Sequence, residues 1–362
     1  MTLEAVPRDA ARARIAGGEP LATRLGATRD RAPVGETTTV LLRVDGRAAY
    51  PVLDGIPILR APEILTDPRE RLEFDLDSGI YAEVYSESGF YEREASEKIR
   101  EIDSVPLAAS RSEAIRHLGR LRQLSESDRA GFPHPRERWL HARMDLGAEW
   151  DCYQHLAPVT GLRLLDLGGS GVASLILLLA GAATAELVTP MLGEARLASK
   201  LAEVLGVSDR FRCVVGIAEA VPLPDASVDA VFSRGSVHHM TTRLAFPEIA
   251  RVLVAGGRFA SIDPWRAPLY GLGTGIFGKR ETAVSCRPLD RDRVAPLFAS
   301  FSRARAVQHG TLTRYPMLAM EKLRVRFPLD LAWAVGRLDD RVSSLVPGLR
   351  GLGSGVALLA TK

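Results

Sequence analysis

The segment RLLDLGGSGVASLILLLA, residues 163–180, decides our prediction of the fold. It begins with an apolar run typical of a buried strand, near whose end stands Asp166. The turn from Gly168 to Gly171 follows, and then a largely apolar stretch, residues 172–183, with the length of a buried helix. Glycines between a strand and a helix let a ligand approach the backbone, and a helix N-terminus favours an anion or a polar group. The segment therefore predicts a ligand pocket at the turn, although a glycine turn is also an ordinary way to leave a strand.

Strands and helices alternate through the rest of this region. Further strands are predicted at residues 185–189, 211–216, 229–233, 258–262, 304–308 and 355–361. Helices are predicted at residues 194–205, at 316–346 with a break near 327–328, and up to residue 253 with Pro247 in the first turn. Such alternation indicates an α/β fold: a Rossmann-like, doubly wound, mainly parallel, seven-stranded sheet with helices on both faces. Ligands of these sheets bind beyond the carboxyl ends of the strands.

Sequence patterns divide the 362-residue chain into four predicted parts. Residues 1–62 form a small β unit with strands at 39–44, 48–53 and 56–59, too small to be stable without docking. Residues 63–155 form a helical cap or linker, with helices at 110–124 and 136–146. Residues 156–266 form the Rossmann-like core, and residues 267–362 contribute lid helices and the closing strands of the sheet.

Composition narrows the classes of partner. A net charge of +3, with 25% charged and 46% hydrophobic residues and no lysine-rich tract, gives no indication of nucleic acid or an anionic membrane as partner. Cys152, Cys213 and Cys286 share no metal-binding spacing, so we expect no metal and a reducing compartment. The N-terminus has no apolar signal core, and we expect a cytoplasmic protein whose partner is a small molecule.

A second stretch makes the fold more specific. Residues 216–240, GIAEAVPLPDASVDAVFSRGSVHHM, resemble the segment between the third and fourth strands of class I S-adenosylmethionine (SAM)-dependent methyltransferases, in particular the type 11 domain. The resemblance continues through residues 248–253 (EIARVL) and 256–259 (GGRF), in the right order and with the right spacing. It covers residues 161–264 and implies methyl transfer with SAM as cofactor.

The resemblance also implies roles for individual residues. The groups expected to contact SAM are Asp166, Gly168, Gly169, Ser170 and Gly171 at its amino-acid part, Thr189, Pro190 and Met191 at the ribose and adenine, Ala218 and Glu219 beside the adenine, and Arg234 and Gly235 near the sulfonium. A side chain placed at Gly168 is expected to fill the turn and to abolish ligand binding without disturbing the fold.

Candidate catalytic and substrate-binding residues flank this site. His238 and His239 are candidate general bases, although histidines here often only shape the pocket and fold in the family. Adjacent residues point in different directions, so at most one of the two is expected to face a substrate. The candidate substrate-binding residues are Tyr85, Tyr91, Trp265 and Arg280. The alternatives are that the aromatics pack the cap onto the core and that Arg280 pairs with Glu281.

Three departures from the family pattern concern the SAM site. In an alignment without gaps, Ser170 and Val172 occupy two positions where the family's turn usually has glycine. Alternatively, the turn in this chain is one residue shorter than the family's. Thr189 replaces a carboxylate that accepts both ribose hydroxyls, although Glu194, five residues on, could reach back. Ile217 replaces an aspartate that accepts from the adenine amino group. Each contact left unmade in a buried site costs roughly 1–3 kcal/mol.

The N-terminal stretch AYPVLDGIPIL, residues 49–59, resembles a small zinc-ribbon-like domain associated with methyltransferases, without its zinc cysteines. The resemblance implies a β fold without metal, which serves either for docking or homodimerisation or as a simple packing module. For the whole chain we expect a SAM-dependent methyltransferase acting on a small specialised metabolite. The alternatives are a cyclase, isomerase or lyase on the same fold, and a non-catalytic partner protein.

Overall fold

A computed structural model describes a large part of the chain. The described residues are 3–7, 39–43, 49–57, 59, 95–100, 102–104, 106, 146–268, 287–314, 316, 319–320, 323, 329–346 and 348–362. The helix predicted at 110–124 lies outside them, as does most of the helix predicted at 136–146. The division of the chain into four parts stays a prediction.

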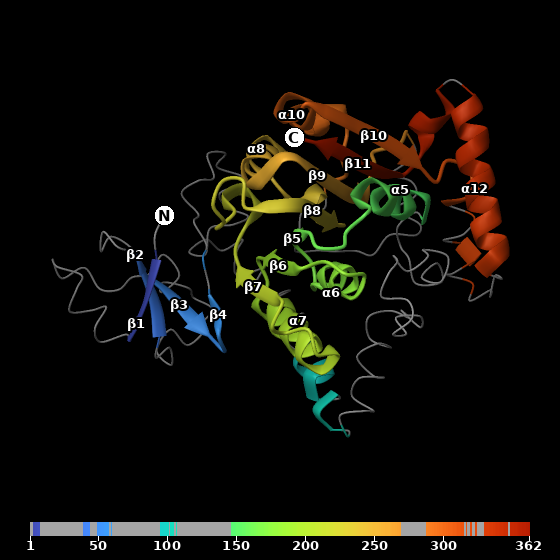
Figure 1. Cartoon of the computed structure of the whole chain (residues 1–362). Helices are drawn as coiled ribbons and strands as arrows, with labels where there is room; N and C mark the ends of the chain where they lie inside the picture. The colour runs from blue at the N-terminus through green and yellow to red at the C-terminus, as the bar shows by residue number, and fades with distance from the viewer. Residues whose placement is uncertain are drawn as a thin grey trace.

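The core of the protein is a seven-stranded sheet, as predicted (Figure 1). Its strand order is β10-β11-β9-β8-β5-β6-β7. The strands are β5 (Arg163–Leu167), β6 (Thr184–Thr189), β7 (Phe211–Val215), β8 (Val228–Arg234), β9 (Leu253–Pro264), β10 (Arg303–His309) and β11 (Gly355–Thr361). Strands β7, β6, β5, β8 and β9 are parallel, and β11 runs antiparallel to both β9 and β10. The carboxyl ends of β5, β6, β8, β9 and β10 therefore share one edge of the sheet.

Helices cover both faces because successive strand residues point to opposite sides. Leu164 belongs to one buried cluster and Leu165 to the other. The first cluster includes residues of α5 (Leu146–Leu156), α6 (Val172–Leu179) and α7 (Leu192–Leu205). The second includes residues of α8 (Thr242–Val252) and α10 (Arg291–Ser300). The result is a three-layer α/β/α core, which confirms the predicted fold class.

Two predicted boundaries are wrong. Helix α8 begins at Thr242, so Pro247 lies in its interior and not in its first turn. Proline removes one helical hydrogen bond, but burial of Ala245, Phe246 and Ile249 holds the helix against the sheet. Strand β9 begins at Leu253 and not at the predicted residue 258, and its pairing is irregular there, because Val228 pairs with Leu253 but Ala230 pairs with Arg258. Helix α10 was not predicted.

The N-terminal unit is a four-stranded antiparallel sheet of β1 (Leu3–Pro7), β2 (Thr39–Arg43), β3 (Ala49–Leu53) and β4 (Ile56–Pro57). Strand β1 was not predicted from the sequence. The unit adjoins β7 (Figure 1), where the amide of Leu59 donates to the carbonyl of Val215 at 2.7 Å. Arg196 of α7 pairs with Asp54 at 2.8 Å. These contacts dock the unit onto the edge of the core.

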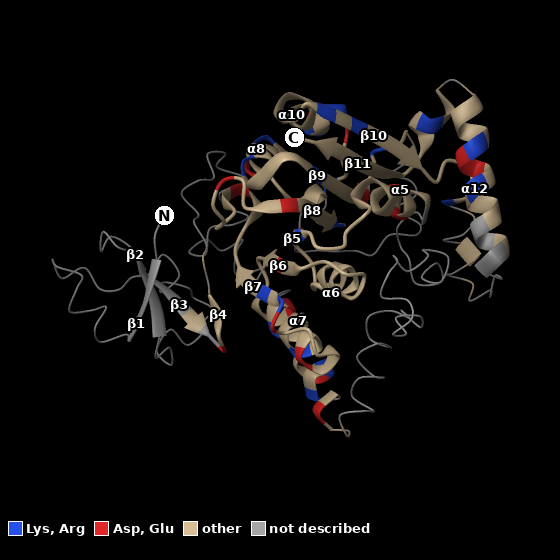
Figure 2. Cartoon of the chain, viewed as in Figure 1, with Lys and Arg blue, Asp and Glu red and all other residues tan. Residues whose placement is uncertain are grey.

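Helix α12 (Leu329–Leu345) lies at the other end of the molecule, where it packs on α5 (Figure 1). Figure 2 shows basic and acidic residues interspersed along α7 and α12. Among the described residues, none of the helices is long and apolar enough to cross a membrane.

Candidate functional site

The turn after β5 adopts a backbone conformation that requires glycine at three positions. Gly168, Gly169 and Gly171 have φ angles of +79°, +73° and +69°, in the left-handed region that other residues seldom adopt. A Cβ added to Gly168 would lie 2.5 Å from the Cβ of Ser236, and one added to Gly171 would lie 2.7 Å from the Cβ of Ala198. At Gly169 the nearest atom would be 3.9 Å away. Gly169 is therefore the place where the turn leaves room for a ligand.

Gly168 instead contributes to internal packing. Ser236, which follows β8, lies against the turn and occupies the space that a side chain at Gly168 would need. The expectation that a side chain at Gly168 would leave the fold undisturbed is therefore wrong, because the first atom that it would meet belongs to Ser236. Its effect on ligand binding stays a prediction.

Asp166 ties the turn to the helix that follows. Helix α6 has no side-chain cap at Gly171, and the buried carboxylate of Asp166 accepts from the Ser174 amide at 3.1 Å and from the Ser174 hydroxyl at 2.9 Å. The helix N-terminus thus finds an acceptor in the preceding strand. Burial raises the pKa of Asp166 to about 7, against the opposing influence of Ser174 and Arg234.

A second acidic group lies beside the end of β8. Glu149 of α5 is fully buried; its Oε1 accepts from the Tyr153 hydroxyl at 2.7 Å, and its Oε2 lies 3.5 Å from Nη2 of Arg234. Arg234 is thus held at the predicted SAM site by α5. Glu149 was not predicted from the sequence, because no spacing within one segment shows that α5 packs on β9 and β11 with this side chain directed to the neighbouring strand β8.

The end of β6 has a carboxylate nearby after all. The buried hydroxyl of Thr189 donates to Oε2 of Glu194 at 3.2 Å, and the Met191 amide donates to the same hydroxyl at 3.4 Å. Glu194 stands in the first turn of α7, which begins two residues after Pro190. Glu194 therefore reaches back to the end of β6, as the sequence allowed. Its carboxylate places beside Thr189 the negative charge that the threonine lacks.

The predicted adenine-side residues lie in a short 3-10 helix, Ala218–Ala220. Ala218, Glu219 and the preceding Ile217 are all buried. Oε1 of Glu219 accepts from the amide of Thr241 at 2.6 Å, so one carboxylate oxygen fixes the chain just before α8. Contact of Ala218 and Glu219 with a ligand stays a prediction.

The two histidines have different environments. His238 is buried, and its Nδ1 lies 2.9 Å from Oδ1 of Asp263, which also accepts from the His238 amide at 3.0 Å. The His239 ring is half-buried, with its centroid 3.9 Å from that of His238. From α10, Arg293 donates to the carbonyl of His238 at 3.1 Å and to that of Met240 at 2.7 Å. A carboxylate thus orients His238, a pairing that spacing alone did not reveal.

Parallel pairing brings many of the predicted site residues to one edge of the sheet. Asp166, Thr189, Arg234 and Asp263 stand at or next to the carboxyl ends of the neighbouring strands β5, β6, β8 and β9. Trp265 is buried in the second core cluster, and its substrate role stays a prediction. Tyr85, Tyr91 and Arg280 lie outside the described residues.

The central segment matches a known family. Residues 165–261, which include most of β5, the turn, β6 to β8 and most of β9, match the model of the methyltransferase domain family. The uncharacterized methyltransferase YcgJ of Bacillus subtilis (strain 168) is 42% identical to this chain over 67 residues. That match covers 18% of this chain and 26% of YcgJ, or about a quarter of that relative's length.

Solved structures of other proteins are similar to part of this chain. Geranyl diphosphate C-methyltransferase from Streptomyces coelicolor A3(2) is 21% identical, with a TM-score of 0.43 over 60% of this chain and 78% of that one. The (4+2)-cyclase SpnF is 21% identical, with a TM-score of 0.41 over 59% of this chain and 79% of that one. The comparisons give no support to the zinc-ribbon resemblance of residues 49–59.

Proposed function

We propose that this protein is a SAM-dependent methyltransferase that acts on a small-molecule acceptor. The observation that carries the proposal is the turn at Gly168–Gly171, with three left-handed glycines anchored by buried Asp166 to the start of α6. It lies inside the segment that matches the methyltransferase domain family. The interspersed charges of α7 and α12 (Figure 2) are in keeping with a small-molecule partner.

The residues at the sheet edge suit SAM chemically. Gly169 leaves room for close approach to the backbone beside the N-terminus of α6, where a carboxylate is favoured. The Glu194 carboxylate, held by Thr189, can accept hydrogen bonds from sugar hydroxyls, which compensates for the neutral threonine at the end of β6. When bound, SAM supplies an electrophilic methyl group on a sulfonium centre. The chain's own contribution is then to position the acceptor and to remove its proton.

His238 is our candidate for the proton acceptor, with Asp263 as its positioning residue. In a neutral ring whose Nδ1–H donates to Asp263, Nε2 is the basic nitrogen. A proton taken from the acceptor at Nε2 would leave an imidazolium, which the buried Asp263 carboxylate stabilises. Asp263 is thus paired with His238, and the His239 ring packs against that of His238.

Calorimetry with SAM and transfer of a labelled methyl group to candidate metabolites test the proposal. We expect micromolar affinity, and absence of binding at millimolar SAM would refute it. In an active assay, His238→Gln should lower kcat about 100-fold or more with a small change in KM. His239→Gln is the matched control and should change kcat only a few-fold. Equal losses for both variants would remove His238 from the proposed role.

One observation favours the alternative of a non-methylating enzyme. Ile217 is buried beside the predicted adenine position and cannot accept a hydrogen bond. Conversion of a metabolite without formation of S-adenosylhomocysteine would support a cyclase, isomerase or lyase activity and refute methyl transfer.

A further inference from the structure

Helix α12 presents its apolar side to solvent. Leu331, Leu338 and Leu345 are 49%, 59% and 81% exposed, and they recur every seven residues, so they lie along one line of the helix surface. Ala334 is exposed and Val342 is half-buried, and both fall on the same side of the helix. We call these five residues the leucine stripe. Single exposed leucines are ordinary, but a continuous apolar stripe indicates a binding surface.

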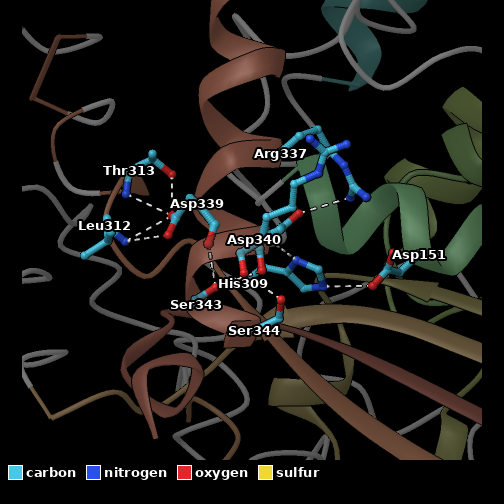
Figure 3. A network of polar contacts seen from close by, with 10 residues as sticks. Asp151, His309, Leu312, Thr313, Arg337, Asp339, Asp340, Ser343 and Ser344 are labelled. Atoms are coloured by element: carbon cyan, nitrogen blue, oxygen red, sulfur yellow. Dashed lines mark hydrogen bonds and ion pairs between the residues drawn. The ribbon is translucent and has the colours of Figure 1, made fainter. Parts of the chain in front are cut away.

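The opposite side of α12 is polar and buried, and it fixes the orientation of the helix. Asp340 accepts from Nδ1 of His309 at 2.7 Å and from Arg337 at 3.1 Å, and Nε2 of His309 lies 3.1 Å from Asp151 of α5 (Figure 3). His309 ends β10, so this network joins α12 to both the sheet and α5.

A neighbouring aspartate adds a second attachment. Asp339 accepts from the amide and hydroxyl of Thr313, at 3.0 and 2.8 Å, and from the amide of Leu312 at 3.0 Å (Figure 3). A rotation of α12 that turned the leucine stripe inward would break these hydrogen bonds of Asp339 and Asp340. The stripe therefore stays on the outer side of the described part of the chain, where a second molecule can cover it.

The spacing of the stripe favours a second copy of this chain as that molecule. From Leu331 to Leu345 the intervals are three, four, four and three residues, a pattern that reads the same in both directions and is centred on Leu338. Two such helices packed antiparallel place Leu331 opposite the partner's Leu345 and Ala334 opposite the partner's Val342. Leu338 then meets its own counterpart on the two-fold axis.

An isologous two-fold interface requires this kind of self-complementarity. Antiparallel alignment also sets each helix terminus beside the opposite end of the partner's dipole. Val346 and Leu352, exposed just beyond the helix, extend the apolar area. We propose that the leucine stripe is the centre of a homodimer interface, in which α12 packs antiparallel against α12 of a second copy.

Sedimentation equilibrium on the full chain tests this proposal. We expect a dimer that dissociates in the micromolar range. Leu338→Glu places two carboxylates together on the axis and should weaken the dimer roughly a hundredfold or more. Leu323→Glu is the matched control: Leu323 is 74% exposed and outside the stripe, so this variant should dimerise like the wild type. If Leu338→Glu fails to fold, Leu345→Glu at the exposed helix end replaces it.

Spin labels test the orientation. In a Cys286→Ser background, where Cys152 and Cys213 are buried, labels at Leu338→Cys should lie close together, because packed helices are about 8–10 Å apart. Labels at Leu331→Cys should be separated by roughly 20 Å along the helix axis. A monomeric wild type, a dimer unaffected by Leu338→Glu, or short distances at both positions would overturn the proposal.

Discussion

Replacing Gly168 with alanine should lower the free energy of unfolding for two reasons that the structure predicts. The first is backbone strain, because φ at Gly168 is +79° and a Cβ in this region costs roughly 1–2 kcal/mol. The second is overlap with Ser236, whose Cβ and Oγ would both lie 2.5 Å from the new atom. The Ser236 Cβ is attached to the main chain, so it can move only if residue 236 moves. Overpacking of this kind costs roughly 1–3 kcal/mol.

Gly206→Ala is the matched control for the strain. Gly206 has a φ of +71°, close to that of Gly168, but an added Cβ would meet nothing within 4 Å. We expect Gly168→Ala to lower the free energy of unfolding by roughly 2–5 kcal/mol, and Gly206→Ala by roughly 1–2 kcal/mol. The difference between the two variants measures the contact with Ser236.

Ser236→Gly should rescue Gly168→Ala because it removes both overlapping atoms. The double variant should then resemble Gly206→Ala in urea unfolding, with a coupling energy of roughly 1–3 kcal/mol. Calorimetry should show SAM affinity reduced in Gly168→Ala and partly restored in the double variant. The reasoning fails if Gly168→Ala is no less stable than Gly206→Ala, or if Ser236→Gly does not restore stability.

Two further predictions concern charges at the same site. Burial raises the pKa of Asp166 from 3.8 to about 7, so the stability that this group contributes is fully present below about pH 4 and is lost as the pH rises through about 7. The difference between these two pKa values corresponds to about 4 kcal/mol of unfolding free energy. In urea unfolding between pH 5 and pH 8, the free energy of unfolding should therefore depend less on pH in Asp166→Asn than in the wild type. Glu194→Gln should weaken SAM binding about tenfold in calorimetry, whereas Glu203→Gln, on the exposed side of α7, should not; equal affinities would refute the role of Glu194.

Local sequence patterns were sufficient to predict most of the core. The run from Arg163 to Leu167, the glycine turn and the following helix were all predictable, because hydrophobic periodicity and glycine placement are properties of short segments. The same reasoning failed at α8, where burial of one helix face outweighs the helix-breaking effect of Pro247. It also missed β1, whose pairing with β2 joins residues more than thirty positions apart.

Pairings between distant residues in the candidate site were not predictable in this way. His238 and Asp263 are 25 residues apart and meet because β8 and β9 lie side by side in parallel. Glu149 reaches Arg234 only because α5 packs on β9, the strand next to β8. Glycine is required at position 168 because Ser236, which follows the neighbouring strand β8, lies against the turn.

The sequence by itself thus predicted the seven strands of the core sheet, the glycine turn after Asp166 and a resemblance to methyltransferases, in keeping with the match of residues 165–261 to that domain family. These follow from periodicity and motif spacing, which are present in the chain before it folds. Only the tertiary structure decided which carboxylate accompanies Thr189, which histidine is paired with Asp263, and that the leucines of α12 point outward. Those features depend on strand register and helix packing, because only the folded sheet brings such groups within hydrogen-bonding distance.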